Sequence, residues 1–379
     1  SFAEILDSKG KIQVYFNRDE ICKGENKEKY NIIYKKLLDI GDIIGIEGEL
    51  FTTKVGEKTV LVKDFTLLNK SLRPLPLPKE DGDGKTYDEF NDTEQRYRQR
   101  YVDLIVNPHV KETFIKRTKI INLIRDFLNS KEYLEVETPM MQSIVGGAAA
   151  RPFSTHHNAL NISLYLRVAP ELYLKRLLVG GMRRVFEINR NFRNEGISKQ
   201  HNPEFTMIEV YEAFGDCETM LELTEGMVRS AATVVGDASA IGFGDLTIDY
   251  ASSFDRISYG DLFENALGIP MSDETAVRST AKENGIDDAD TLNHWLLVDV
   301  LFGSKAEATI DPSRPTFVTD FPSAISPLTR PHNDDATLSH RWELFVAGME
   351  IANAYTELND PDLQLQRFTE QLEGADEEV

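Results

Sequence analysis

The stretch VFEINRNFRNE at residues 185–195 decides the fold. From position 187 onward its odd positions are polar, namely Glu187, Asn189, Asn191, Arg193 and Glu195. Most of its even positions are apolar. Because successive side chains of a strand point to opposite faces, this alternation predicts a strand with one polar face.

The chain is expected to return on a second strand after a loop that contains His201. Glu209 and Tyr211 again fall at odd positions, with apolar residues between and beside them. We therefore expect an antiparallel β-hairpin between residues 185 and 214. Its polar face could hold an anionic group near Arg193 while its carboxylates meet cations or amines. A second interpretation stays open, an edge hairpin whose polar face is solvated.

Length and composition limit the classes of protein. The 379 residues are too many for one ordinary core and predict two or three domains. The net charge of -21 means that a nucleic acid must meet local basic patches, not the whole surface. No run reaches the ~20 apolar residues of a membrane span, and no signal peptide is evident, so we expect a cytoplasmic protein. Cys22 and Cys217 are too isolated for a disulfide framework or a zinc knuckle.

Several segments outside the hairpin have a recognisable pattern. Short β-rich runs fill residues 2–68 and predict a small barrel, and alternate prolines over 72–78 predict an extended linker. Residues 94–104 predict an arginine-rich helix, whose arginines at 96, 98 and 100 we interpret as ion-pair partners on a solvated face, with contacts to nucleic-acid phosphates as the alternative. An amphipathic helix follows from 114 to about 131. Residues 236–315 are interpreted as a helical insertion.

A second group of polar residues lies near the end of the chain. Asn353, Tyr355 and Glu357 share a face if this stretch is a strand. Glu350 has the wrong parity for that face unless a β-bulge intervenes. With Glu343 it could coordinate Mg²⁺, which prefers carboxylate oxygens together with substrate phosphates. The alternative to a metal site is that Glu343 and Glu350 are simply solvated surface acids.

A third group combines Gly146 and Gly147 with Glu171 at the expected start of a helix. Glycine lets the backbone approach a ligand closely, and a carboxylate is favourable at a helix N-terminus. Alone, the glycine pair indicates no more than a turn.

Taken together, these stretches resemble the class II lysyl-tRNA synthetases over essentially the whole chain. FRNE at 192–195 with HNPEF at 201–205 is similar to motif 2 of that family, and the helix that ends at Pro139 is similar to motif 1. The resemblance implies an α+β multidomain fold, an N-terminal OB-fold β-barrel followed by a catalytic domain on an antiparallel sheet. It also implies a homodimer through motif 1. The expected domain bounds are 1–72 for the OB-fold, 73–106 for a linker and connecting helix, and 107–379 for the catalytic domain.

The resemblance implies a role for each residue of motif 2. Arg193 contacts both the lysine carboxylate and the ATP α-phosphate as the carboxylate attacks in line, so charge neutralisation and positioning supply the catalysis. The implied ATP contacts are Glu195 and Asn202 on the nucleotide, His201 on the outer phosphates and Phe205 on adenine. Glu343 and Glu350 hold Mg²⁺.

An acidic pocket for L-lysine is implied as well, formed by Gly147, Glu171, Tyr211, Asn353, Tyr355 and Glu357. An aspartate side chain beside Glu171 and Glu357 would meet like charge, which separates this family from the related aspartyl and asparaginyl enzymes. In the N-terminal domain, Phe2 and Gln13 fall where the family stacks on and hydrogen-bonds an anticodon base of tRNA(Lys).

One feature of the family has no counterpart in the sequence, the glycine-rich stretch and arginine of motif 3. We therefore expect this chain alone to be weak in amino-acid activation. Two alternatives stay open. One is the relative that lysylates elongation factor P, disfavoured by the N-terminal barrel that it lacks, and the other is a non-catalytic tRNA-binding or regulatory paralogue.

Overall fold

The computed structural model describes residues 1–80, 86–87, 90–148, 150–198, 201–287 and 289–374. The chain forms two compact units, Ser1–Ile115 and Lys116–Val379. No helix among the described residues is both long and apolar enough to cross a membrane.

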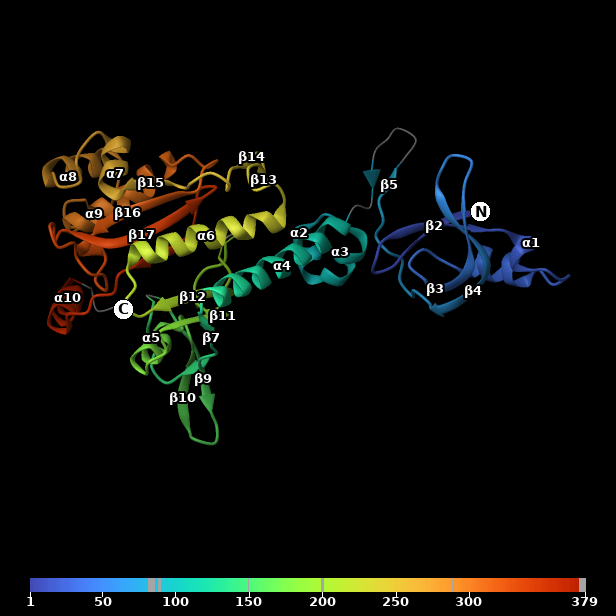
Figure 1. Cartoon of the computed structure of the whole chain (residues 1–379), viewed down its shortest axis with the longest axis horizontal. Coiled ribbons are helices and arrows are strands. Elements are labelled where there is room, and N and C mark those ends of the chain that lie inside the picture. Colours follow the sequence, from blue (N-terminus) through green and yellow to red (C-terminus); the bar gives the residue numbers. More distant parts are fainter. Residues whose placement is uncertain (81–85, 88–89, 149, 199–200, 288, 375–379) are drawn as a thin grey trace. The chain divides into compact units, whose positions relative to one another are not determined.

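The first unit is built on a four-stranded sheet of order β1-β2-β4-β3 (Figure 1). Its strands are β1 (Phe2–Leu6), β2 (Lys11–Phe16), β3 (Ile43–Thr52) and β4 (Lys58–Asn69). β2 runs parallel to β4, and the other two pairings are antiparallel. The predicted β-rich character of residues 2–68 is confirmed. Among the described strands no pairing joins β3 back to β1, so the sheet does not close through hydrogen bonds.

One face of this sheet carries the core of the first unit. Val14, Phe16, Val62 and Phe65 are almost completely buried there. The helix α1 (Arg18–Ile21) and the π-helical segment η1 (Lys29–Leu37) add apolar side chains to the same cluster. The opposite face of β1 and β2 is left with exposed side chains, since strand residues alternate between faces.

The arginine-rich stretch is two helices, α2 (Thr93–Arg98) and α3 (Arg100–Val106), where a single helix was expected. Asp103 is completely buried and accepts hydrogen bonds from Arg96, Arg100 and Asn107. On one straight helix Arg96 and Asn107 would lie roughly 16 Å apart. The break at Gln99 lets donors on both sides of it reach one carboxylate. Arg98 pairs with Glu94, so the predicted ion pairs of all three arginines are confirmed, but only the pair of Arg98 lies on a solvated face.

The second unit contains a hairpin of β11 (Arg184–Phe192) and β12 (Glu204–Glu212), joined in register from Arg184↔Glu212 to Phe192↔Glu204. β7 (Leu134–Glu135) pairs in parallel with the other edge of β11. The predicted hairpin is confirmed, and β11 is a central strand. The long helix α4 (Pro108–Ser130) precedes it and begins earlier than the expected residue 114, at a proline suited to a first helical position.

A four-stranded sheet of order β15-β16-β17-β18 forms the rest of the unit's centre. Its strands are β15 (Asp255–Ser258), β16 (Thr316–Pro322), β17 (Leu338–Val346) and β18 (Met349–Tyr355). The helix α6 (Cys217–Val235) runs along one face (Figure 1), where Trp342 donates a 2.7 Å hydrogen bond to the carbonyl of Cys217. The other face packs against α7 (Tyr259–Leu267) and α9 (His294–Leu301), with α8 (Glu274–Glu283) beside α9.

The segment 236–315 is only partly helical, which corrects the expected helical insertion. It contains the hairpin β13 (Ile241–Phe243) and β14 (Leu246–Ile248) and also the edge strand β15. These strands have only three or four residues, too few for an alternation to be visible in the sequence.

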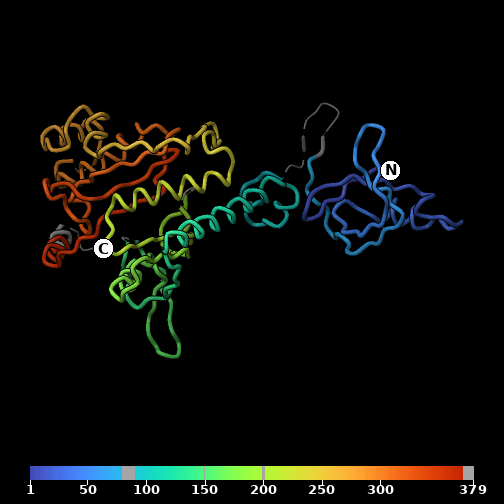
Figure 2. The backbone as a smooth tube through the Cα atoms, viewed as in Figure 1, coloured from blue at the N-terminus to red at the C-terminus, as the bar shows by residue number. Residues whose placement is uncertain are grey.

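The remaining elements of the second unit are short. α5 (Glu171–Val179) packs on the β11–β12 hairpin. β8 (Met141–Gln142), β9 (Phe153–His157) and β10 (Ile162–Leu166) form a small sheet, whose β9–β10 hairpin projects from the unit (Figure 2). α10 (Pro361–Gly374) closes the described part of the chain.

Candidate active site

The polar face of β11 is buried. Glu187 and Asn191 are each only 1% exposed, so the solvated edge hairpin is the wrong interpretation. Glu187 forms a 2.8 Å ion pair with Arg167, which is equally buried. A buried, charged face is stable only when its groups are paired or meet a ligand. The burial and pairing of Glu187 therefore place this face inside the second unit.

Arg193 lies just beyond β11, where its backbone N–H donates a 2.9 Å hydrogen bond to Pro203. Its guanidinium carbon is 5.3 Å from the centre of the Phe205 ring. The Nε of Arg193 is buried and has no hydrogen-bond partner within the described part of the chain. A buried donor without an acceptor is costly, so this geometry favours an anionic ligand at Arg193.

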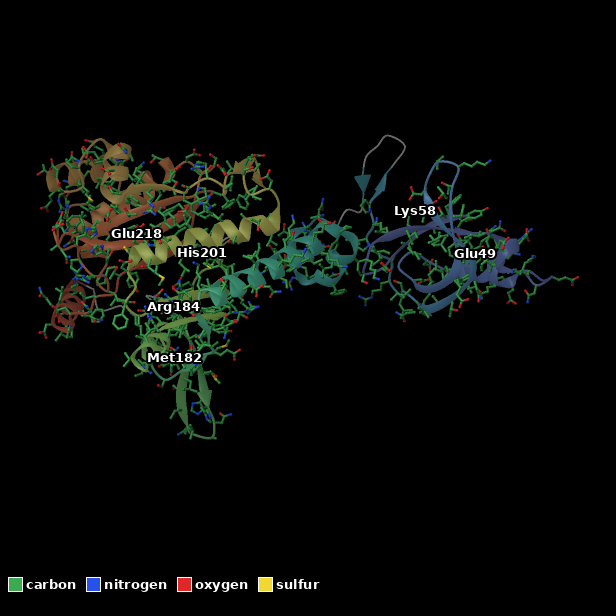
Figure 3. All side chains as sticks on the ribbon, viewed as in Figure 1. Glu49, Lys58, Met182, Arg184, His201 and Glu218 are labelled. Atoms are coloured by element: carbon green, nitrogen blue, oxygen red, sulfur yellow. The ribbon has the colours of Figure 1, made fainter. Side chains whose placement is uncertain are left out.

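The other motif 2 residues lie in the loop beside Arg193. Glu195, His201 and Asn202 are exposed, and His201 (labelled in Figure 3) places its Nδ1 2.8 Å from the Ser198 hydroxyl. The side-chain amide of Asn202 donates a 2.8 Å hydrogen bond to the backbone carbonyl of Glu204. These residues, which are predicted to bind ATP, thus lie at the loop end of the hairpin.

A cluster of acidic side chains, which we assign as the candidate amino-acid pocket, lies at the N-terminus of α5. Its first residue, Glu171, is only 6% exposed. Gly147 lies against it with φ +90°, and a Cβ on Gly147 would be 3.1 Å from the Cβ atoms of both Glu171 and Ala169. Glycine is needed here by both backbone conformation and space.

Two further acids join this pocket from other elements. Glu357 follows β18, and its backbone forms an isolated bridge with Thr329. Lys175, one turn after Glu171, places its Nζ 2.5 Å from Glu171 Oε1 and 2.9 Å from Glu357 Oε2. Glu209 on β12 accepts a 2.9 Å hydrogen bond from the Tyr211 hydroxyl.

The pocket carries more negative than positive charge. The pKa of Glu209 is raised to about 7, mainly by burial and also by the charges of Glu171 and Glu187, against the lowering effect of Tyr211 and Arg167. Burial also raises the pKa of Tyr355, and the charges of Glu171, Glu357 and Glu209 contribute to this rise. Such an arrangement gains most from a ligand that brings an ammonium group.

Glu209 is the residue that the sequence-based site omitted. The alternation placed it on the polar face, but nothing in the sequence showed that it faces Glu171 on another element. Tyr211 was a predicted site residue, and Glu209 lies two positions before it on the same face of β12. That spacing is the signal that could have added Glu209 to the site.

Glu343 and Glu350 lie on one face of β17 and β18. A register shift between Leu344 and Phe345 places Glu350 opposite Phe345, on the face that Glu343 and Asn353 share. This is the bulge that the parity of Glu350 required, and Asn353 donates a 3.1 Å hydrogen bond to Glu350. Tyr355 pairs with Arg341 on the same face.

The residues present fit a divalent cation that is completed by substrate oxygens. Glu343 is 8% exposed, and its pKa is raised to about 7, mainly by burial and also by the charge of Glu350, despite the adjacent Arg341. Two coupled carboxylates are the protein ligands that Mg²⁺ usually takes. No cluster of three or more His, Cys, Asp or Glu is arranged for a metal within the described residues, so protein atoms alone would not complete the site.

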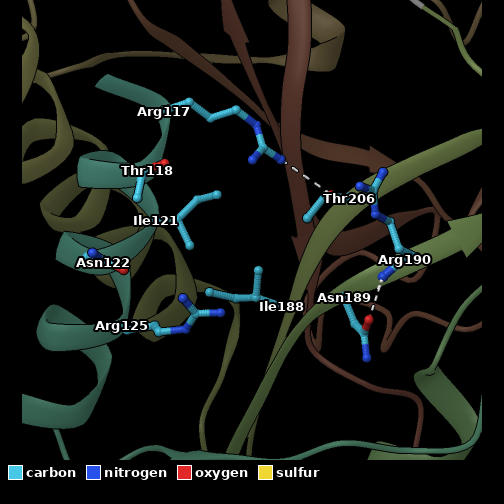
Figure 4. Close-up of a pocket in the computed structure, with 9 residues that line it drawn as sticks. All are labelled: Arg117, Thr118, Ile121, Asn122, Arg125, Ile188, Asn189, Arg190 and Thr206. Atoms are coloured by element: carbon cyan, nitrogen blue, oxygen red, sulfur yellow. Dashed lines mark hydrogen bonds between the residues drawn. The ribbon is translucent and has the colours of Figure 1, made fainter. Parts of the chain in front are cut away.

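A separate hollow of about 290 Å³ lies between α4 and the β11–β12 hairpin (Figure 4). Its lining residues are Arg117, Thr118, Ile121, Asn122, Arg125, Ile188, Asn189, Arg190 and Thr206. None of these is a predicted site residue, so the hollow is distinct from the site around Arg193 and Glu171.

Phe2 and Gln13 lie together on the outer face of the first unit's sheet. Phe2 is 58% exposed and pairs with Tyr15, with 4.7 Å between ring centres. The Thr59 hydroxyl donates a 2.8 Å hydrogen bond to Gln13 Oε1, which turns the amide nitrogen away from Thr59. An exposed ring beside an oriented amide suits an unstacked base.

Comparison with known proteins agrees with this geometry. Residues 92–379 match the family of class II tRNA synthetases (D, K and N), and residues 1–68 match the OB-fold nucleic acid binding domain. The fold and the site thus define a class II aminoacyl-tRNA synthetase with an OB-fold domain.

Three curated relatives narrow the class further, and each is named lysine–tRNA ligase. The protein of Christiangramia forsetii is 56% identical over the whole chain, which covers 67% of that relative. That of Porphyromonas gingivalis is 48% identical over the whole chain, with 66% of the relative covered, and that of Azobacteroides pseudotrichonymphae is 50% identical over 98% of the chain, with 74% covered. The chain belongs to the lysine–tRNA ligase family and spans about two thirds of the length of these relatives.

Proposed function

We propose that this protein activates L-lysine with ATP to lysyl-adenylate and then transfers lysine to the 3'-terminal ribose of tRNA(Lys). The observation that carries the proposal is the pocket of Glu171, Glu209 and Glu357, in which the ammonium of Lys175 pairs with Glu171 and Glu357 while Glu209 accepts a hydrogen bond from the Tyr211 hydroxyl. The site gains charge balance from a cationic side chain. A free aspartate side chain would add a like charge and is disfavoured.

The proposed activation step joins the substrate carboxylate to the α-phosphorus of ATP. A carboxylate oxygen forms the new bond, the bond from that phosphorus to the bridging oxygen breaks, and pyrophosphate leaves. Arg193 contacts both anions, and its guanidinium gains most as charge develops at phosphorus. In the second step the tRNA ribose hydroxyl attacks the acyl carbon and AMP leaves. Neither step needs a nucleophile from the protein.

We assign ATP binding to the loop end of the β11–β12 hairpin. Phe205 stacks on adenine, Glu195 and Asn202 hold the nucleotide, and His201 faces the outer phosphates. Mg²⁺, held by Glu343 and Glu350, supplies charge neutralisation to the phosphates when bound. On the lysine side, Gly147 lies near the α-amino group, while Tyr211, Asn353 and Tyr355 complete the pocket around the side chain.

The domain bounds, the dimer and the cellular location are proposed from the resemblance to the same family. We assign the anticodon-binding domain to residues 1–72, a connecting segment to 73–106 and the catalytic domain to 107–379. A second copy of the chain pairs through the motif 1 helix, and the protein acts in the cytoplasm without a membrane partner. The acidic overall charge leaves tRNA binding to local surfaces such as the face of Phe2 and Gln13.

The test of the tRNA step is lysine transfer to tRNA(Lys) by a Phe2→Ala variant. Stacking of one base on an aromatic ring contributes ~1–3 kcal/mol, so kcat/KM for tRNA should fall about 10- to 100-fold. Lysine-dependent ATP–pyrophosphate exchange should not change, since the first unit takes no part in activation. Leu50→Ala, which removes an exposed side chain from β3 of the same sheet, serves as the matched control. Normal charging by Phe2→Ala would remove this face from the tRNA contact.

A further inference from the structure

Lys175 is a charged residue of the pocket to which the proposed reaction gives no role. Its ammonium joins two carboxylates from different elements, Glu171 at the start of α5 and Glu357 beyond β18. We propose that Lys175 is a positioning residue that holds both carboxylates in place and turned toward the substrate, so that a cationic amino acid binds to their remaining oxygens. This inference rests on the proposed function, since it takes lysine as the ligand.

The geometry leaves one oxygen of each acid for a ligand. Lys175 contacts Oε1 of Glu171, while Oε2 is the atom nearer to Gly147, 3.5 Å from where a Cβ would lie. On Glu357 it contacts Oε2. The spacing of four residues on α5 fixes Lys175 beside Glu171 in the absence of any substrate. The ammonium is thus a permanent part of the wall.

The charges around Lys175 explain why an ammonium is needed there. Glu171 lies on its own helix, Glu209 and Tyr211 face the pocket from β12, and Tyr355 and Glu357 come from the end of β18. Arg167 and Arg341 are the other cations that act on these groups. In this partly buried space the carboxylates repel one another, and each loses some of its hydration.

Electrostatic effects at the two ends of the bridge agree with this role. Burial raises the pKa of Glu357, and the charge of Glu171 raises it further, while the Lys175 ammonium lowers it. Burial would lower the pKa of Lys175, but Glu357 and Glu171 outweigh it and raise that pKa above its ordinary value. Lys175 therefore stays charged at neutral pH. Without it, Glu357 would take up a proton at higher pH and lose its affinity for an ammonium group.

A competing role predicts the opposite effect. If the Lys175 ammonium merely occupied the place of the substrate ammonium, lysine would have to displace it, and removal of Lys175 would tighten lysine binding. The two roles therefore differ in the sign of the change in lysine affinity.

The experiment measures L-lysine binding by calorimetry, and lysine-dependent ATP–pyrophosphate exchange, between pH 6 and pH 9. In Lys175→Met the lysine Kd should rise about tenfold at pH 7, as expected when a charged hydrogen-bond network loses one partner. The loss should be greater at pH 6 than at pH 8.5, because Glu357 is protonated more readily. Lys175→Arg should restore most of the affinity, and the KM for ATP should stay within about twofold. Lys175→Gln, which keeps a polar side chain, covers the case of a misfolded Met variant.

Arg176→Met is the matched control, since Arg176 is the exposed neighbour on the same helix and stacks on Tyr173. It should bind lysine as the unmodified chain does. Lysine affinity that is unchanged or tighter in Lys175→Met and Lys175→Gln, with an unshifted pH profile, overturns the positioning role alone. Absence of lysine binding in the unmodified protein overturns the proposed function, and the inference with it.

Discussion

Replacement of Arg193 by alanine should lower the rate of lysyl-adenylate formation about 10²- to 10³-fold or more, while the lysine Kd rises much less. The backbone of Arg193 is held at the end of β11 by its hydrogen bond to Pro203, and the guanidinium lies over the Phe205 ring. Its buried Nε has no partner within the described residues, so the group is prepared for an anion. It interacts most strongly when charge develops at the α-phosphorus, which is why kcat should suffer more than binding.

The measurement is ATP–pyrophosphate exchange at varied lysine and ATP, together with lysine binding by calorimetry. Arg190→Ala is a suitable control, because Arg190 is an arginine of the same hairpin that lies half exposed beside Glu204 and lines the separate hollow. It should leave activation nearly unchanged. Equal losses of lysine binding and of activation in Arg193→Ala would reduce Arg193 to a binding residue.

The second large effect is expected from Glu357→Gln, which should raise the lysine Kd about 10- to 100-fold. The change keeps the shape of the side chain but removes one charge that faces the substrate ammonium. It also removes one of the two partners of Lys175, so the remaining carboxylate Glu171 gains a larger share of that ammonium. ATP binding should change little, because the assigned nucleotide contacts lie at the other end of the site.

Calorimetry with L-lysine and, separately, with ATP distinguishes these effects. Glu218→Gln is the comparison variant, since Glu218 is an acid on α6 whose partner is Arg256 on β15. Lysine affinity equal to that of the unmodified protein in Glu357→Gln would remove Glu357 from the pocket.

The sequence predicted the parts of the site that lie on single strands. Alternation was sufficient for the β11–β12 hairpin, because a two-residue period is visible along β11 and over residues 208–211 of β12. It did not distinguish a solvated face from a buried one. That distinction came from β7, which pairs with the edge of β11, and from Arg167, which forms an ion pair with Glu187. Neither contact has a local signal in the chain.

The parts that sequence reasoning missed depend on residues far apart in the chain. The spacing of Glu171 and Lys175 predicts only an ion pair between side chains one turn apart on the same helix. Glu357 reaches Lys175 because it follows the strand β18, which the sequence does not place beside α5. The parity of Glu350 indicated that a bulge was necessary, but only the register of β17 and β18 located it. The break at Gln99 likewise follows from the burial of Asp103, which composition does not reveal.

The central claim is that the acidic pocket selects lysine for activation. It is tested most directly by ATP–pyrophosphate exchange with L-lysine, L-aspartate, L-asparagine and L-arginine, on the 379-residue chain and on a chain extended to the length of its relatives. The account predicts exchange in the extended chain with L-lysine alone among the four. Exchange that depends on aspartate or asparagine, or no exchange with lysine in the extended chain, would contradict it.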